Sequence, residues 1–277
     1  NLFQSLIISA GQVSKVITAD EVKAVTLTGS EPAGSAVASL AGKLIKKTVL
    51  ELGGSDPFIV LRDADLSKCA DTAITARFLN GGQSCIAAKR FIVDASAARE
   101  FEKMIQNRMD KLIVGDPMNE KTDIGPLARP EFVNELDRQV QNSIRQGARL
   151  VTGGARGESP GNFYQPTLLC DVTDRMDVFQ QETFGPVFVI IPVKDEKTAI
   201  KLANDSEFGL GASLWTKDPE KGEKLAAQIN AGSVFINGMV KSDPRLPFGG
   251  IKKSGYGREL SHYGIREFVN IKTVWIQ

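Results

Sequence analysis

The chain has 277 residues, 42% of them hydrophobic and 24% charged, a composition typical of a folded globular protein. Its 34 basic and 33 acidic residues give a net charge of +1, which argues against the strongly basic surface of a nucleic-acid-binding protein. No apolar run reaches the roughly 18 residues that a membrane span needs, so neither nucleic acid nor a membrane is expected as a partner.

The cysteines and the single histidine limit the kinds of site that the chain can build. Cys69, Cys85 and Cys170 are widely spaced and odd in number, which predicts free thiols and a reducing, cytoplasmic setting rather than a disulfide framework. With His262 as the only histidine, we expect no metal site of the structural zinc type.

Strand-like and helix-like segments alternate along the chain. Strands are predicted at 23–28, 48–52, 57–61, 91–93, 188–193, 211–215, 233–236 and 270–276, and helices at 32–46, 65–78, 97–112, 131–146, 197–203 and 219–229. This alternation predicts an α/β fold with a largely parallel sheet. The apolar run at 188–193 suits a strand buried on both faces, and Gly53-Gly54 is the predicted crossing point between domains.

Cys85 is a candidate nucleophile. It ends the segment 80–85 (NGGQSC), in which Gly81 and Gly82 would allow the backbone to approach a ligand closely. If a helix began at Ser84-Cys85, its free N–H groups and its dipole would lower the pKa of the thiol and could hold an oxyanion. Taken alone, the residue is explained more simply as a buried structural cysteine.

Glu51 is a candidate general base. It stands between Leu50 and Leu52, directly before the Gly53-Gly54 turn. In apolar surroundings the pKa of a carboxyl rises, which suits a base that works near neutral pH. A solvent-facing glutamate on an edge strand explains the residue equally well when it is taken alone.

Two turns are candidates for cofactor binding. The turn at 29–34 (GSEPAG) joins a predicted strand to a helix and could hold a phosphate at the helix N-terminus, with Ser30 or Glu31 as the cap, although it does not match GxGxxG. Glu182 and Phe184 precede an apolar strand, where they could bind a ribose and pack on a flat ring. Ordinary turns remain the alternative for both.

The loop before Pro247 offers positive charge. Lys241, Ser242 and Arg245 could meet a substrate carboxylate, and a solvated basic loop is the open alternative. Cysteine-dependent hydrolases pair their nucleophile with a histidine, but nothing around His262 suggests an active-site role. If Cys85 is a nucleophile, its base is therefore expected to be a carboxylate.

Together these segments resemble the aldehyde dehydrogenase superfamily over nearly the whole chain. Five blocks match in order, which is highly specific: 27–30 (LTGS), 50–54 (LELGG), 82–85 (GQSC), 182–186 (ETFGP) and 247–250 (PFGG), the last continuing to residue 259. The segments 80–90 (NGGQSCIAAKR) and 253–263 (KSGYGRELSHY) are most similar to bacterial NAD(P)-dependent succinate-semialdehyde dehydrogenases.

The resemblance implies an aldehyde dehydrogenase-like α/β architecture. Residues 1–52 would be the tail end of a Rossmann-like nucleotide-binding domain, 53–262 a parallel-sheet catalytic domain, and 263–277 a C-terminal return with an oligomerisation strand. It also implies NAD or NADP as cofactor, a small aldehyde such as succinic semialdehyde as substrate, and a homo-oligomer.

Residue roles follow from the same resemblance. Cys85 matches the thiol that forms a thiohemiacetal and then a thioester, and Glu51 matches the base that activates water. The remaining matches lie around the cofactor pyrophosphate, nicotinamide and ribose: Gly29, Ser30, Gly34, Leu52, Gly53, Glu182 and Phe184. No metal is implied.

The family's N-terminal half has no match in this chain. That half carries an oxyanion asparagine in a Trp-Asn-Phe-Pro-like block, and neither Trp215 nor Trp275 is followed by Asn. Losing such a donor typically costs about 10²–10³ in rate, so we expect this chain alone to be a weak or inactive enzyme. A non-catalytic oligomerising fragment and a Cys-dependent acyl hydrolase or transferase remain alternatives.

Overall fold

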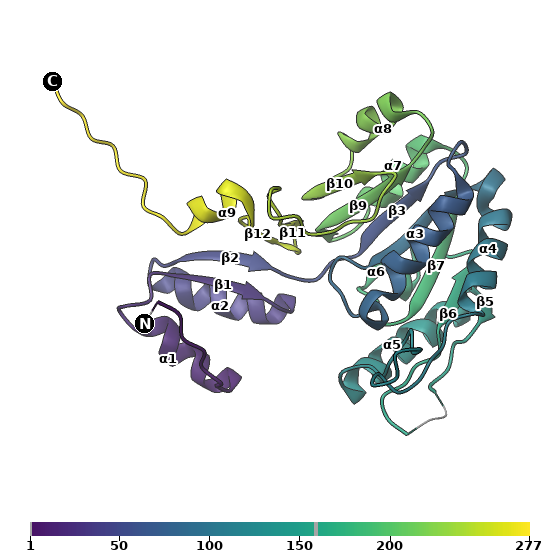
Figure 1. Cartoon of the computed structure of the whole chain (residues 1–277), viewed down its shortest axis with the longest axis horizontal. Coiled ribbons are helices and arrows are strands. Elements are labelled where there is room, and N and C mark those ends of the chain that lie inside the picture. Colours follow the sequence, from purple (N-terminus) through teal and green to yellow (C-terminus); the bar gives the residue numbers. More distant parts are fainter. Residues whose placement is uncertain (1, 158–159) are drawn as a thin grey trace.

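In the computed structural model, which describes residues 2–157 and 160–277, the strands form a large sheet, a small sheet and a two-stranded ribbon (Figure 1). Helices accompany both larger sheets, and most neighbouring strands run parallel. The predicted α/β class with a largely parallel sheet is confirmed.

The small sheet is built on one strand–helix–strand unit near the N-terminus. Strand β1 (Ala24–Thr28) leads through helix α2 (Glu31–Lys43) to β2 (Lys47–Glu51), which lies parallel to β1. Ser30 caps α2 by accepting a hydrogen bond from the Ala33 N–H at 3.5 Å, as its sequence position predicts. The short strand β12 (Gly255–Tyr256) adds antiparallel to β2, and η1 (Ala10–Gln12) and α1 (Val13–Thr18) precede the unit.

The large sheet has the strand order β10-β9-β3-β4-β7-β6-β5, and only the β5–β6 pair is antiparallel. Its strands are β3 (Asp56–Val60), β4 (Ala88–Asp94), β5 (Arg149–Thr152), β6 (Thr167–Cys170), β7 (Val187–Val193), β9 (Gly211–Trp215) and β10 (Ser233–Ile236). Six of the seven residues of β7 are buried, which confirms the strand predicted from the apolar run.

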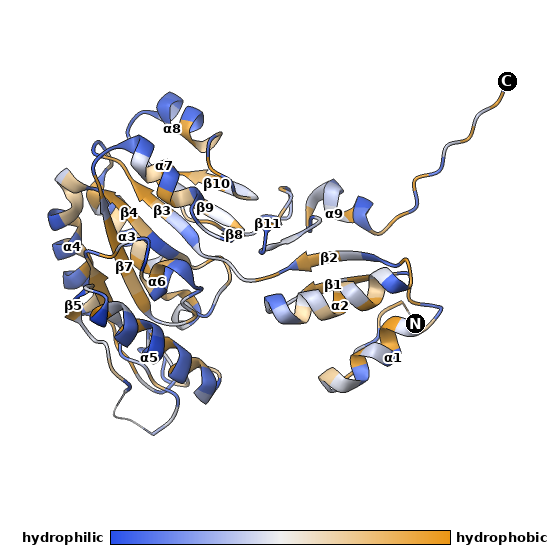
Figure 2. Cartoon of the chain, turned by 180° about the vertical axis from the view of Figure 1, so that it is seen from behind, coloured by the Kyte–Doolittle hydropathy of each residue, from blue (hydrophilic) through white to orange (hydrophobic). Residues whose placement is uncertain are grey.

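Side chains of the central strands alternate between two cores. Phe58, Phe91 and Phe188 face one core, shared with α3 (Leu66–Phe78) and α4 (Ala95–Met109). The residues next to them in sequence face the other core, under α5 (Pro130–Arg145), α7 (Glu196–Asn204) and α8 (Pro219–Ala226). Figure 2 shows the resulting pattern, with apolar strands between helices whose outer faces are polar. The short helix α6 (Asp177–Gln180) packs beside α5.

The chain passes from the small sheet to the large one at Gly53-Gly54, between β2 and β3. It returns through β11 (Ile251–Lys252), which pairs with β8 (Phe208–Gly209), and then β12, before α9 (Ser261–Glu267). The division at 52/53 and 262/263 stays a prediction, although contact with the small sheet resumes by Gly255.

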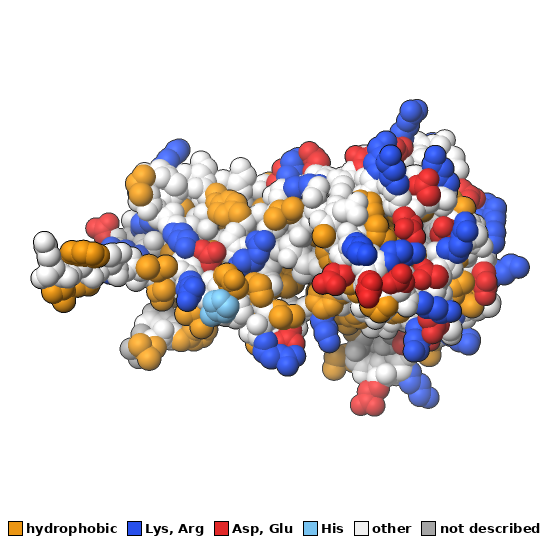
Figure 3. Space-filling view, turned by 90° about the horizontal axis from the view of Figure 1, so that it is seen from above, with side chains coloured by type: hydrophobic (Ala, Val, Ile, Leu, Met, Phe, Trp, Pro, Cys, Tyr) orange, Lys and Arg blue, Asp and Glu red, His pale blue; other side chains and the backbone are white. Residues whose placement is uncertain are grey.

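The predicted strand at 270–276 does not form. This segment has no secondary structure, and it extends away from the body of the molecule (Figure 1). A β-strand needs a neighbour for its backbone groups, and none of the described residues supplies one. Ile271, Val274, Trp275 and Ile276 are between 73% and 88% exposed, and the apolar side chains along this tail stand out at the left of Figure 3.

Among the described residues, no helix combines the length and the apolar character needed to cross a membrane.

Candidate active site

Cys85 lies in a turn between the 3₁₀ segment η2 (Leu79–Gly82) and strand β4. The turn is closed by a hydrogen bond from the Ala87 N–H to the Ser84 carbonyl at 3.1 Å. No helix begins at Ser84-Cys85, so the predicted lowering of the thiol pKa by a helix dipole is wrong. Burial instead raises the pKa of the Cys85 thiol, helped by Asp56 and Glu182 and opposed by Lys89 and the Ile86 N–H.

Gly82 allows this turn to approach the loop before β7. Its φ of +78° lies in the left-handed region, and a side chain there would collide with the Gly185 carbonyl. The buried guanidinium of Arg77 ties the same elements together by donating to the carbonyls of Gly82, Thr183, Gly185 and Ala88. The sequence motif around Cys85 therefore serves close packing of the backbone.

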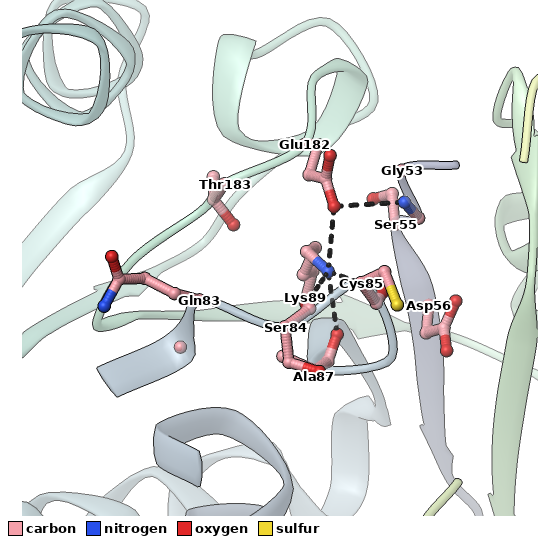
Figure 4. A network of polar contacts seen from close by, with 12 residues as sticks. Gly53, Ser55, Asp56, Gln83, Ser84, Cys85, Ala87, Lys89, Glu182 and Thr183 are labelled. Atoms are coloured by element: carbon pink, nitrogen blue, oxygen red, sulfur yellow. Dashed lines mark hydrogen bonds and ion pairs between the residues drawn. The ribbon is translucent and has the colours of Figure 1, made fainter. Parts of the chain in front are cut away.

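A buried lysine, Lys89, binds the backbone carbonyls of the Cys85 turn. The Lys89 Nζ donates to the carbonyls of Ser84 at 3.0 Å, Cys85 at 2.9 Å and Ala87 at 3.2 Å. It also lies 3.4 Å from the Glu182 Oε1, although the lysine side chain is completely buried. Figure 4 shows the ammonium between the Cys85 turn and Glu182.

The Gly53-Gly54 link meets both Glu182 and the Cys85 turn. The Gly54 N–H donates to the Glu182 Oε1 at 3.0 Å, and a side chain on Gly53 would collide with Glu182 Oε2. A Cβ on Gly54 would lie 2.6 Å from the Cys85 carbonyl oxygen. The structure thus brings Gly53, Glu182 and Cys85 into one site.

Glu51 ends β2, three residues before Gly54, and is 3% exposed. Neither carboxyl oxygen has a hydrogen-bond partner among the described residues, and a Cβ on Gly249 would lie 2.8 Å from Oε1. Burial, reinforced by Glu259 and opposed by Arg258, raises the pKa of Glu51 to about 8. The predicted rise is confirmed, and the solvent-facing alternative is wrong.

The other predicted cofactor residues surround the end of β2. The Gly29 N–H donates to the Glu51 carbonyl at 3.0 Å, and Ser30 caps α2 directly after it. Gly34 lies against Leu52, since a side chain at Gly34 would come within 2.7 Å of the leucine methyl groups. Phe184 instead packs edge-on against Phe132, with ring centroids 5.5 Å apart.

Three buried charged residues of this site are absent from the sequence-based candidates: Asp56, Arg77 and Lys89. Asp56 accepts a hydrogen bond from the Gly211 N–H at 3.0 Å, and its Oδ2 is buried without a partner among the described residues. Burial raises its pKa to about 7 against the effects of Lys89, the Gly211 N–H and Arg90. The missed signal was the pair of charges, Lys89-Arg90, at the start of a strand that is otherwise apolar.

His262 does not belong to this site. It is exposed on α9 and packs on Tyr263, with ring centroids 4.2 Å apart. The charged groups that act on Cys85 are Lys89, Asp56 and Glu182. Within the described residues, no group of three or more Cys, His, Asp or Glu side chains is arranged to hold a metal ion.

We predict that Asp56→Asn stabilises the fold in a pH-dependent manner. Because folding raises the pKa of Asp56 from 3.8 to about 7, the folded state holds the proton more tightly and loses stability as the pH rises through that window. At pH 8 the variant should unfold with a free energy on the order of 2–4 kcal/mol higher than the unmodified chain, and the gain should shrink toward pH 4. Urea titrations at several pH values measure it.

Ser55→Ala is the matched control, because this neighbouring hydroxyl is also buried without a partner among the described residues but does not titrate. Its effect on stability should be the same at every pH. A stabilisation by Asp56→Asn that did not depend on pH would contradict the buried-carboxyl account.

Comparison with known proteins gives a consistent match. The model of the aldehyde dehydrogenase family matches residues 2–274. A probable NADP+-dependent succinate-semialdehyde dehydrogenase of Synechocystis sp. is 56% identical over 274 residues, and succinate-semialdehyde dehydrogenase (NADP+) 1 of Mycobacterium tuberculosis is 51% identical. Each alignment covers 99% of this chain, which spans 60% of the length of these relatives.

A solved structure agrees with these relatives. The succinic semialdehyde dehydrogenase of Streptococcus pyogenes, crystallised in complex with NADP+, superposes with a TM-score of 0.94 at 42% identity and covers 98% of this chain. The chain spans 60% of that structure as well. On the family match and on these relatives, this chain belongs to the aldehyde dehydrogenase family.

Proposed function

We propose that this chain carries the nucleophile and the base of an NAD(P)-dependent oxidoreductase that converts an aldehyde to the carboxylic acid. The observation that carries the proposal is that two unusual groups lie at the ends of one short backbone link. Glu51 is a buried carboxyl group without a partner among the described residues, and Gly54, three residues later, lies so close to Cys85 that a Cβ there would come within 2.6 Å of its carbonyl oxygen. Free thiols at all three cysteines suit a reducing, cytoplasmic setting.

The residues present fit a nicotinamide cofactor. Gly53 keeps open the space beside the Glu182 carboxylate, which a Cβ would fill, and Glu182 is a suitable acceptor for ribose hydroxyls. In the first turn of α2 the Ala33 and Gly34 N–H groups are bonded to Ser30 and Pro32 has none, so the Glu31 N–H and the helix dipole are what could face a phosphate. Gly34 and Leu52 lie behind this turn. When bound, the nicotinamide would supply the hydride acceptor. The relatives' names favour NADP for this site.

The protein groups then have distinct tasks. The Cys85 sulfur adds to the aldehyde carbon, and the Cys85 backbone N–H, which has no acceptor among the described residues, can support the oxyanion. After oxidation, the acyl group is held as a thioester on Cys85. Glu51 in its ionised form takes a proton from water, the hydroxyl oxygen bonds to the acyl carbon, and the sulfur leaves.

Succinic semialdehyde is the substrate that we propose, in line with the names of the relatives. Its carboxylate needs a positive or hydrogen-bonding group beyond the aldehyde site. Val240 lies against Gly211, the residue that binds Asp56, so Lys241 and Ser242 follow directly at the edge of the site. Arg245 is a weaker candidate, because its guanidinium is already paired with Asp243 at 2.6 Å.

We predict that Cys85→Ser and Glu51→Gln separate the two halves of the reaction. With an activated aryl ester and no cofactor, the unmodified chain should form and then hydrolyse an acyl group on Cys85, while Cys85→Ser should form none. Glu51→Gln should acylate but release the acyl group about 10²-fold more slowly or worse, since it lacks the base. Mass spectrometry of the intact protein follows both steps.

The pH dependence of acyl release adds a second readout. Release of the acyl group needs ionised Glu51, so the release rate should climb as the pH rises through about 8. In Glu51→Gln this rise in the release rate should be absent. An acyl group that disappears equally fast in both proteins would exclude Glu51 as the base. Acylation at another residue would exclude Cys85.

We also predict that the slow reduction of NADP+ expected of this chain favours succinic semialdehyde over butanal, which lacks the carboxylate. Lys241→Met should raise the KM for succinic semialdehyde and leave the KM for butanal unchanged. The reason is that the variant loses a contact with the carboxylate that is equally strong in the ground state and in the transition state. The absorbance of the reduced cofactor measures both. Equal use of the two aldehydes would contradict the substrate assignment.

A homo-oligomer is the assembly that we propose. The apolar residues of the tail at 270–276 are strongly exposed, and an extended segment of this kind gains both hydrogen bonds and apolar cover from a second copy. We predict that deleting residues 270–277 shifts the sedimentation coefficient toward that of a monomer. An unmodified chain that sediments as a monomer at micromolar concentration would count against the proposal.

A further inference from the structure

Lys89 is placed to connect two parts of the site that come from distant segments. Its ammonium donates to all three carbonyls of the Cys85 turn that lie within reach, at 2.9–3.2 Å, and lies 3.4 Å from the carboxylate of Glu182. Glu182 in turn accepts from the Gly54 N–H through the same Oε1 atom. One buried charge therefore touches the nucleophile turn and the carboxylate that we assign to the cofactor (Figure 4).

The energetics make this connection sensitive to Glu182. A completely buried ammonium is costly unless it is paired and its donors are satisfied. The carboxylate that forms an ion pair with Lys89 is Glu182, whereas Asp56 acts on it only at longer range. A change in the charge or hydrogen bonding of Glu182 must therefore alter how tightly the ammonium holds the carbonyls of the turn.

We propose that Lys89 is a positioning residue that couples the state of the Glu182 carboxylate to the placement of the Cys85 sulfur. Engagement of Glu182 by a ligand hydroxyl would redistribute the hydrogen bonds of Lys89 and shift the turn that carries the nucleophile. The inference rests on the roles proposed above for Cys85 and Glu182. Its test needs neither turnover nor bound cofactor.

The test is a double-mutant cycle on the reactivity of the thiol. Iodoacetamide alkylation of Cys85 is followed from pH 7 to pH 11 by mass spectrometry of its peptide in the unmodified chain, Lys89→Met, Glu182→Gln and the double variant. The plateau rate fitted at high pH reports placement and access of the thiolate, and the inflection reports its pKa. Cys69 and Cys170 are buried, and their peptides are resolved separately.

Coupling predicts that Glu182→Gln changes the plateau rate by about threefold or more when Lys89 is present and by less than about twofold when it is methionine. The inflection should move to higher pH in Lys89→Met, because the ammonium lowers the pKa of the thiol. Additive effects on the plateau rate would overturn the proposal, even if turnover assays uphold Cys85 as the nucleophile. Conversely, a nonadditive cycle would establish the coupling between Lys89 and Glu182 even if Cys85→Ser retained turnover and so excluded Cys85 as the nucleophile.

Two further variants keep the test interpretable. Lys46→Met is the matched control, because Lys46 also donates to two backbone carbonyls, those of Ile17 and Ala19, but lies in the small-sheet region. It should leave the reactivity of Cys85 unchanged, and a change of the same size as in Lys89→Met would overturn the proposal. If Lys89→Met does not fold, Lys89→Gln, which also removes the charge but retains a hydrogen-bond donor, completes the cycle, and the same threefold and twofold limits decide.

Discussion

The whole site depends on a stretch of backbone that carries no side chains, Gly53-Gly54. Here the link between the two sheets passes close to the Glu182 carboxylate and the Cys85 carbonyl. A Cβ on Gly53 would collide with the first, and a Cβ on Gly54 with the second. Neither residue has a positive φ, so glycine is required for space and not for conformation. The link thereby connects Glu51, at the end of a strand of one sheet, to the surroundings of Cys85, in the turn before a strand of the other.

Acidic and basic side chains lie around this link in nearly equal numbers. Burial is the main cause of the raised pKa of the Cys85 thiol, Lys89 opposes it, and Asp56 and Glu182 add to it. The pKa of the thiol, and with it the reactivity of Cys85, is therefore sensitive to the neighbouring charges. Arg77 and Arg90 contribute positive charge while donating mainly to backbone carbonyls, so they hold loops in place without neutralising either carboxylate directly.

The predictability of the fold follows the range of the interactions involved. The strands around Phe58, Phe91 and Phe188 were evident from their local apolar runs, and the cap at Ser30 from its position before a helix. The antiparallel strands β5 and β12 were not predicted, because their short, mixed sequences become strands only through partners elsewhere in the chain. Likewise the motif around Cys85 identified the residue but not its turn, since that conformation depends on contact with Gly185.

The site was predictable to the same extent. Cys85, Glu51 and Glu182 stand in recognisable motifs, and the raised pKa of Glu51 follows from its apolar neighbours. Asp56 and Lys89 have no motif of their own, and their burial becomes apparent only when β3 and β4 are paired within the sheet. The segment at 270–276 shows the opposite case. Its alternating apolar residues have the composition of a strand, yet a strand forms only between two segments, and none of the described residues supplies the second. The sequence of this tail therefore favours a strand without being able to form one alone.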